Sequence, residues 1–340
     1  MEHFGVYKGE RNNRGQPHGF GKFVWRTNKD VYEGQWYKGK QHGVGTMHYA
    51  TFQYVYHGEW NLGARHGLGT MTLANGDQLT GTFINNEFEG QGVIYYHNGD
   101  FYEGDVIKGL RHGEGTLRYF NGEYYEGQWF NNQRHGFGRQ TQPDGTQYYY
   151  GNWRYDQPMG IGKLCQVVET GVLATLEGTF HNGSLYGKGI LADTTGNLYK
   201  GDFKDNHIHG VGELYLSNGQ KYIGEFKYDD FKKGKAEMPD STVTYGTFYH
   251  FDPDGKNVKI NYGNGDIYEG GMKQGMKHGF GRLKATDGAV FVGNFHEDSK
   301  EGEARIVYPD GSEYVADYTA GIEKEPGILI KPTAKDKKKK

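Results

Sequence analysis

The histidines of this 340-residue sequence are the first candidates for metal binding or proton transfer, because seven of the fifteen stand in a His-Gly-x-Gly motif. On stacked β-hairpins, histidines one repeat apart would be separated by two strand spacings, about 10 Å. Zinc ligands, in contrast, must all lie within about 2.3 Å of one ion. His207 and His209 are the only local pair, so we predict that the histidines pack or hydrogen-bond and that the chain has no metal site. The motif histidines are His18, His42, His66, His112, His135, His209 and His278.

The Gly-x-Gly elements and the single cysteine are the other candidates for chemistry. A dinucleotide-binding loop needs G-x-G-x-x-G between a strand and a helix, whereas Gly43-Val44-Gly45 leads into a second strand-like pattern. Cys165 lies in an apolar, strand-like run, which predicts a buried and unreactive thiol. The sequence therefore predicts no catalytic residue and no cofactor, and we expect a protein that is not an enzyme.

Composition limits both the fold and the partners. Glycine accounts for 57 of the 340 residues, and each glycine disfavours a helix by about 1 kcal/mol. The 28 Tyr, 19 Phe and 5 Trp exclude a disordered glycine-rich linker, so short strands and tight turns are favoured. The formal net charge is −3, and because the last six residues carry +4, the rest carries −7, which opposes a broad nucleic-acid-binding face. With one cysteine, no signal peptide and no run of 18 apolar residues, we expect a cytoplasmic protein.

One sequence pattern repeats about every 23 residues along the chain. A complete repeat begins with Tyr-x-Gly, continues with His-Gly-x-Gly and closes with Asn-Gly or Asp-Gly, and several of the fourteen repeats keep only some of these landmarks. Between these landmarks apolar and polar residues alternate, which predicts strands, and Asn-Gly or Asp-Gly is typical of type I′ turns. Each repeat is therefore predicted to be a β-hairpin. A single hairpin is marginally stable, so the hairpins must stack to bury their aromatic face.

The longer motif Tyr-Glu-Gly-x-Trp-x-x-Gly-x-x-His-Gly-x-Gly, present with small departures at 102–115 and 125–138, resembles the MORN (membrane occupation and recognition nexus) repeat. The resemblance covers nearly the whole chain. It implies an all-β fold, an elongated single-sheet solenoid of about fourteen stacked MORN β-hairpins. Proteins that are similar in this way include radial-spoke head proteins of motile cilia, cytoskeletal scaffolds of protist parasites and junctophilins.

The landmarks divide the chain into four parts. Residues 1–227 hold repeats 1–10, with a longer hairpin at 152–177, and residues 263–327 hold repeats 12–14. Between them, residues 228–262 lose the landmarks and are predicted to be an irregular, degenerate repeat, either a decayed repeat with a longer turn or a bend that docks a partner. Residues 328–340 are predicted to be a disordered basic tail.

Two surfaces are candidates for partner binding. The lysines at the end of the chain form a solvated run that either contacts an acidic partner or only aids solubility; they are Lys337, Lys338, Lys339 and Lys340. One face of the predicted sheet carries a row of rings that no other segment of the chain is expected to cover. We predict that this aromatic groove binds a partner, unless twist of the sheet seals it. Its residues are Tyr32, Trp36, Tyr56, Trp60, Phe83, Tyr102, Tyr125, Trp129, Tyr149 and Trp153.

Near-complete coverage by repeats resembles the radial-spoke head proteins. We therefore predict a non-enzymatic structural scaffold that organises protein partners in a cytoskeletal assembly, with the axoneme of a cilium or flagellum as the expected place. The expected partners are other proteins of a large assembly, among them another MORN protein or a second copy, and no nucleic acid. The alternative is a peripheral membrane scaffold that binds anionic phospholipids or tethers a membrane to the cytoskeleton. The acidic body opposes it, because anionic membranes attract basic segments.

Overall fold

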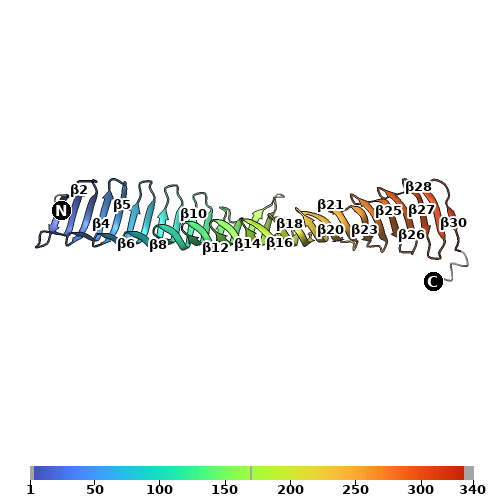
Figure 1. Cartoon of the computed structure of the whole chain (residues 1–340), viewed down its shortest axis with the longest axis horizontal. Helices are drawn as coiled ribbons and strands as arrows, with labels where there is room; N and C mark the ends of the chain where they lie inside the picture. The colour runs from blue at the N-terminus through green and yellow to red at the C-terminus, as the bar shows by residue number, and fades with distance from the viewer. Residues whose placement is uncertain (1–3, 169–170, 333–340) are drawn as a thin grey trace. The chain divides into compact units, whose positions relative to one another are not determined.

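The structure, a computed structural model, describes residues 4–168 and 171–332. All regular secondary structure in these ranges is β-strand, with thirty strands and no helix (Figure 1). Within each unit nearly all strands pair antiparallel with their neighbours in the sequence, and no described strand closes the sheet into a barrel. The short strands β22 and β29 are exceptions, since β21 also pairs with β23 and β28 also pairs with β30. The prediction of an all-β fold of stacked β-hairpins is thus confirmed.

The first of two compact units comprises residues 1–166. Its strands stand side by side in chain order, from blue to green in Figure 1. They are β1 (Gly5–Arg11), β2 (Pro17–Trp25), β3 (Val31–Tyr37), β4 (Lys40–Tyr49), β5 (Tyr54–Asn61), β6 (Ala64–Thr72), β7 (Gln78–Ile84), β8 (Glu87–Tyr95), β9 (Phe101–Ile107), β10 (Leu110–Arg118), β11 (Tyr124–Phe130), β12 (Gln133–Thr141), β13 (Tyr148–Arg154) and β14 (Gln157–Val167), the last residue of which falls in the second unit.

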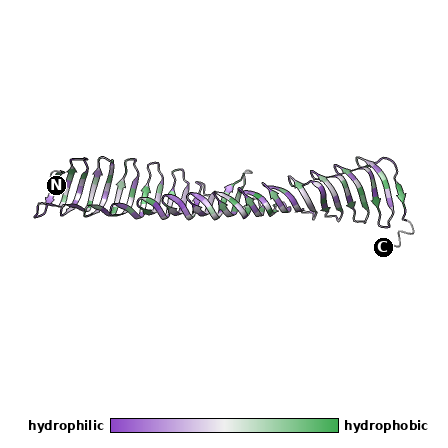
Figure 2. Cartoon of the chain, in the orientation of Figure 1, coloured by the Kyte–Doolittle hydropathy of each residue, from purple (hydrophilic) through white to green (hydrophobic). Residues whose placement is uncertain are grey.

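The second unit comprises residues 167–340 and repeats the same arrangement. Its strands are β15 (Leu173–His181), β16 (Ser184–Asp193), β17 (Leu198–Lys204), β18 (His207–Tyr215), β19 (Lys221–Lys227), β20 (Asp230–Glu237), β21 (Val243–Tyr249), β22 (Asp252–Pro253), β23 (Gly255–Asn261), β24 (Ile267–Lys273), β25 (Met276–Lys284), β26 (Val290–His296), β27 (Ser299–Val307), β28 (Glu313–Thr319), β29 (Ile322–Glu323) and β30 (Ile328–Ile330). In both units apolar and polar residues alternate along the strands, as Figure 2 shows.

One glycine from every strand of the first unit aligns with a glycine of the next strand. Within a hairpin Gly34 faces Gly45, and between hairpins Gly45 faces Gly58. We call this line of residues the glycine row. In order across the sheet it contains Gly9, Gly21, Gly34, Gly45, Gly58, Gly69, Gly81, Gly92, Gly104, Gly115, Gly127, Gly138, Gly151 and Gly162.

Tyrosine rings occupy the space that the glycine row leaves free. A Cβ atom on Gly45 would lie 2.3 Å from the Tyr32 hydroxyl, which donates a hydrogen bond to the Gln35 carbonyl at 2.9 Å. The Tyr32 ring meets Trp36 of its own hairpin and Trp60 of the next hairpin edge-to-face, at centroid distances of 5.1 and 5.3 Å. Such edge-to-face pairs stabilise a core beyond the area that they bury. The ring stack therefore links this hairpin to the next, and Tyr125 with Trp153 repeats the link further along the unit.

The turns differ from the sequence prediction. At Asn75-Gly76 only the glycine has a positive φ, 92°, and the Asn75 Oδ1 accepts a hydrogen bond from the Asp77 backbone N–H. These Asn-Gly loops join one repeat to the next and are not type I′ turns. Two consecutive positive φ values, which a type I′ turn needs, occur at the opposite end of the hairpin, for example 48° at Lys38 and 84° at Gly39.

Polar side chains in both rows of turns bind the backbone of the neighbouring repeat. The Asp77 Oδ1 accepts a hydrogen bond from the His97 N–H at 2.8 Å at one edge of the sheet. At the other edge the Asn86 Oδ1 accepts one from the Arg65 N–H at 3.0 Å. Both bonds cross from one hairpin to the next, about one repeat away. Side-chain hydrogen bonds therefore join neighbouring repeats at both rows of turns, in addition to the β-ladder between the strands.

Two segments bear on the predicted boundaries. Residues 228–262, predicted to be an irregular, degenerate repeat, hold β20 to β23, and Gly234 and Gly246 align as members of a glycine row. The segment is irregular after β21, which pairs with both β22 and β23, and Val258 stands in the next glycine place. Residues 328–330, predicted to begin a disordered tail, form β30, which pairs with β28. The loss of sequence landmarks did not remove the hairpins, because β-pairing depends on the backbone. The predicted tail residues 333–340 lie outside the described residues.

Substitution in the glycine row should be far more damaging than substitution in a turn. In the Gly115→Ala variant the new Cβ would lie 2.3 Å from the Tyr102 hydroxyl, and we expect a loss of about 3 kcal/mol, at the upper end of overpacking costs. Gly109 has a φ of 75° with open space around it, so we expect Gly109→Ala to cost only about 1 kcal/mol. Urea unfolding followed by tryptophan fluorescence compares the two; equal midpoints would contradict the role assigned to the row.

The core tyrosines should make the fold sensitive to alkali. Burial raises the pKa of Tyr56, Tyr149 and Tyr268 to about 12, from an ordinary value of 10.0. Because folding favours the neutral phenol, its contribution is complete below about pH 10 and is lost as the pH rises towards 12. We expect tyrosinate absorbance to rise in two phases as the pH increases. Exposed tyrosines should ionise near pH 10, and the core tyrosines should ionise at higher pH, together with the loss of the β-sheet circular dichroism signal. One phase near pH 10 with the fold intact would show that the rings are accessible.

Candidate protein-binding surface

The ten rings predicted to line an open aromatic groove are instead the core of the first unit. None is more than 6% exposed. An open groove would leave the rings accessible in the isolated chain, so the prediction that a partner binds there is wrong. The alternative that the groove is sealed describes the structure better. The exposed fractions are 0% for Tyr32, Tyr56, Tyr102 and Tyr125, 1% for Phe83, 4% for Trp60, Trp129 and Trp153, 5% for Trp36 and 6% for Tyr149.

Basic side chains cover part of this ring stack. The Arg111 guanidinium lies 4.4 Å from the centre of the Trp129 ring, and the Arg134 guanidinium lies 4.4 Å from that of Trp153. Arg134 is also held by Asp156, whose carboxylate accepts from its Nε at 3.0 Å. Each arginine directly precedes a motif histidine in the sequence, a signal that the sequence analysis did not use.

In the part of the chain that the structure describes, six of the seven motif histidines, all except His66, contact another ring, in line with the expected packing. His42 lies 5.4 Å from the Tyr37 ring, and His112 lies 5.2 Å from the Phe130 ring, between centroids. In the local pair, the His207 Nδ1 lies 2.6 Å from an Asp229 carboxylate oxygen, while the His209 ring contacts Tyr228. Across the described residues no group of three or more His, Cys, Asp or Glu side chains could hold a metal ion. Cys165 is buried, as predicted.

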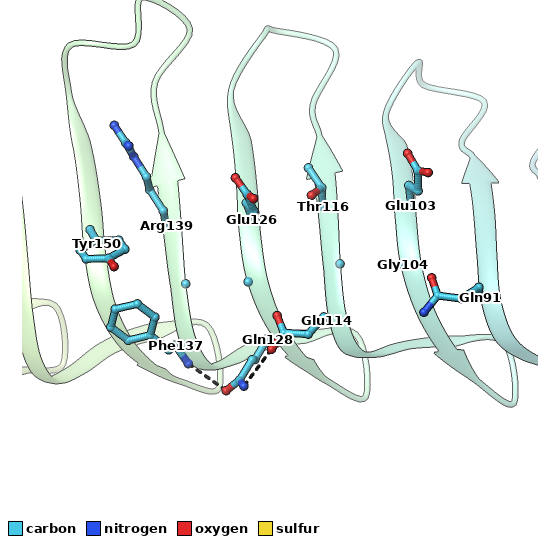
Figure 3. Close-up of a pocket in the computed structure, with 13 residues that line it drawn as sticks. Gln91, Glu103, Gly104, Glu114, Thr116, Glu126, Gln128, Phe137, Arg139 and Tyr150 are labelled. Carbon is cyan, nitrogen blue, oxygen red and sulfur yellow. Dashed lines mark hydrogen bonds between the residues drawn. The ribbon is translucent and has the colours of Figure 1, made fainter.

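A groove follows the glycine row on the face of the first unit that points away from the rings. Over β8 to β13 it encloses a volume of about 690 Å³ (Figure 3). Its floor is the backbone of Gly104, Gly115, Gly127 and Gly138. The wall residues alternate with the core residues along each strand, so they point outwards. We call this hollow the glycine groove.

The glycine groove is acidic. Glu103, Glu114 and Glu126 line it, and Arg139 is the one basic residue among the residues that line it. One end of the groove is aromatic, because the Phe137 and Tyr150 rings meet edge-to-face at 4.7 Å and are 45% and 46% exposed. The surface therefore offers carboxylates beside two accessible rings, a combination suited to a basic peptide segment.

Amide and carboxylate side chains fix the shape of the groove. The Gln128 Oε1 accepts a hydrogen bond from the Phe137 N–H at 3.0 Å, and the Gln128 amide donates to Glu114 at 2.9 Å (Figure 3). In the preceding hairpin the Asp105 Oδ2 accepts from the Glu114 N–H at 2.9 Å. The two backbone bonds span the irregular part of each hairpin, where the register shifts. The bond between Gln128 and Glu114 joins one hairpin to the next. Sequence reasoning missed the role of this polar residue, although it recurs directly after Tyr-x-Gly.

A second hollow of about 380 Å³ lies on the same glycine row, over β4 to β7. Here the x position of Gly-x-Gly is apolar, with Val44 and Leu68 49% and 65% exposed. The chemistry of the outward face along the glycine row therefore changes through the first unit, from apolar over β4 to β7 to acidic and then aromatic over β8 to β13.

In the residues that the structure describes, no helix is long and apolar enough to span a membrane.

The comparisons with known proteins identify the repeat. A model of the MORN repeat matches ten segments that together make up more than half of the chain, in both units. Comparison with curated proteins gives no match. The matched segments are residues 13–29, 32–53, 56–78, 80–101, 102–124, 125–147, 149–165, 199–221, 268–290 and 291–313.

Three solved structures show distant similarity. The G-box domain of the microcephaly protein CPAP is 14% identical, with 72% of this chain and 100% of that chain covered and a TM-score of 0.23. The TCP domain of Drosophila melanogaster SAS-4, solved with a proline-rich motif of Ana2, is also 14% identical, with coverage of 74% and 90% and a TM-score of 0.15. Virginiamycin B lyase from Staphylococcus aureus is 10% identical, with coverage of 96% and 99% and a TM-score of 0.13. These scores are too low to support an inference about this chain.

Tryptophan fluorescence should report the sealed ring stack. Trp36, Trp60, Trp129 and Trp153 are at most 5% exposed, and Trp25 is more accessible. We expect blue-shifted emission that acrylamide quenches weakly in the isolated chain, because the quencher must contact the indole. The Trp25→Phe variant should lose most of the quenchable fraction. Strong quenching that persists in this variant would mean that the stack is open.

Proposed function

The chain belongs to the MORN-repeat family, and on that premise we propose that it is a non-enzymatic scaffold that organises protein partners in a cytoskeletal assembly. MORN repeats are a structural repeat type that suggests a protein-binding or membrane-binding scaffold. For this chain we propose the axoneme of a cilium or flagellum as the assembly, in a role like that of the radial-spoke head proteins that it resembles in repeat coverage.

The observation that carries the proposal is the outward face of the glycine row. In the first unit every hairpin presents equivalent wall positions beside a glycine floor, and hairpins follow one another at two strand spacings, about 10 Å. A partner segment that runs across the strands would meet equivalent positions at that interval. Glu103 and Glu126, for example, occupy the same place in successive repeats of the groove. Such a surface holds partners in register.

The charge of the groove favours protein partners over membranes. Its carboxylates would repel anionic lipid head groups, which attract basic surfaces. The basic residues Lys337–Lys340 lie outside the described residues, and we propose them as an electrostatic contact with an acidic partner.

The location of the chain in a ciliated cell tests the proposed function. We expect a tagged copy to stay with the axoneme after detergent removes the membranes, because a scaffold is held by protein contacts. In a parallel measurement, purified chain should not co-sediment with phosphatidylserine vesicles at physiological salt. Complete extraction by detergent together with salt-resistant vesicle binding would overturn the cytoskeletal proposal in favour of the membrane alternative.

A further inference from the structure

We propose that the glycine groove over β8 to β13 binds the lysine-rich segment Lys335–Lys340 of a second copy of this chain. The inference rests on the proposed scaffold function and names one partner for the groove, the chain itself. The occupant is a segment outside the described residues, and three features of the groove favour it, namely charge, length and the aromatic end.

Charge is the first feature. Residues 87–154, which hold β8 to β13, contain nine Asp or Glu and six Lys or Arg, whereas residues 1–58 contain four Asp or Glu and eight Lys or Arg. The strands under the groove are thus more acidic than the N-terminal strands of the same unit. Glu103 and Glu126 form no ion pair with another described residue, so both carboxylates are available. The segment Lys335–Lys340 has five lysines and one aspartate, the densest positive charge in the sequence.

Length is the second feature. The groove crosses six strands, from β8 to β13, so its path across five strand spacings is about 24 Å. Six extended residues reach about 20 Å. The segment Lys335–Lys340 can therefore lie along the glycine floor with its ammonium groups beside Glu103, Glu114 and Glu126. A floor without side chains lets an extended backbone approach closely.

The aromatic end is the third feature. Phe137 and Tyr150 expose their rings where the carboxylates end. A lysine ammonium binds the face of such a ring when it lies within about 6 Å of the ring centre. The same chemistry occurs within this chain, where the Arg139 guanidinium lies 4.4 Å from the centre of the Tyr148 ring.

The contact joins two different surfaces of the chain, so it is heterologous. Repetition of a heterologous contact produces rings when it closes and open filaments when it does not. Each copy would use its own groove for one neighbour and its own lysines for the other. The ion pairs are solvent-exposed and individually weak, so the assembly depends on salt and on the local concentration of the chain.

Charge reversal in the full-length chain tests the proposal. One variant carries Glu103→Lys, Glu114→Lys and Glu126→Lys, and a second carries Lys337→Glu, Lys338→Glu, Lys339→Glu and Lys340→Glu. We expect the native chain to self-associate at low salt in sedimentation velocity, and each variant alone to associate at least about tenfold more weakly, since several exposed ion pairs are lost at once. An equimolar mixture of the variants should associate again, because the native lysines of one meet the native groove of the other.

Three controls make the result decisive. Glu303→Lys changes a carboxylate at the Gly-x-Gly position that Glu114 occupies, but in the second unit, and it should associate like the native chain. A labelled peptide of residues 327–340 should bind the native chain and not the groove variant in fluorescence anisotropy. Native association should weaken as salt screens the charges.

A native chain that stays monomeric at low salt overturns the proposal, and so does a mixture of variants that fails to associate. Equal loss in the Glu303→Lys control would also overturn it, since that loss would reflect the net charge of the chain. These outcomes leave the proposed scaffold function untouched, because that function is tested by location in the cell.

Discussion

A tyrosine ring that lies over a glycine of the neighbouring strand is the contact on which the rest of the structure depends. Gly45 must lack a side chain because the Tyr32 hydroxyl lies 2.3 Å from where a Cβ would stand. The ring in turn must be buried, because it is wedged between two tryptophans. This pairing sets the register of adjacent strands, since a slip of one residue would turn the rings to the opposite face. The outward groove exists for the same reason, as the other side of the glycines that accommodate the rings.

Much of the fold followed from sequence pattern, but the state of the aromatic face did not. Alternation shows that Tyr32 and Trp36 share a face, and it cannot show what covers that face, because the covering atoms belong to other repeats. Arg134 covers a ring one hairpin further along the chain. Asn-Gly is likewise compatible with more than one type of turn. In this structure the hydrogen bond from the Asp77 N–H to the Asn75 side chain favours a loop other than the predicted type I′ turn.

The formal net charge also did not indicate how charge is distributed over the surface. A formal net charge of −3 is small, yet acidic residues gather in the repeats around the groove and lysines gather at the end of the chain. In a stacked fold, neighbours in sequence stay neighbours in space, so a local excess of charge becomes a local field. The groove was not predicted, because its wall residues Glu103, Glu114 and Glu126 lie on the face opposite the rings, for which the sequence pattern indicated no role.

The direction of the hydrogen bonds has a mechanical consequence. Within a unit the hairpins stack along the direction in which inter-strand hydrogen bonds point, and antiparallel bonds stand perpendicular to the strands. Compression along the stack is resisted by rings in contact, such as Tyr32 and Trp60 at 5.3 Å. Tension acts on all the ladders in series, together with turn bonds such as that between Asp77 and His97, so the weakest ladder separates first. A unit would therefore act as a stiff spacer under compression, and under tension it would lengthen as one hairpin after another unfolds.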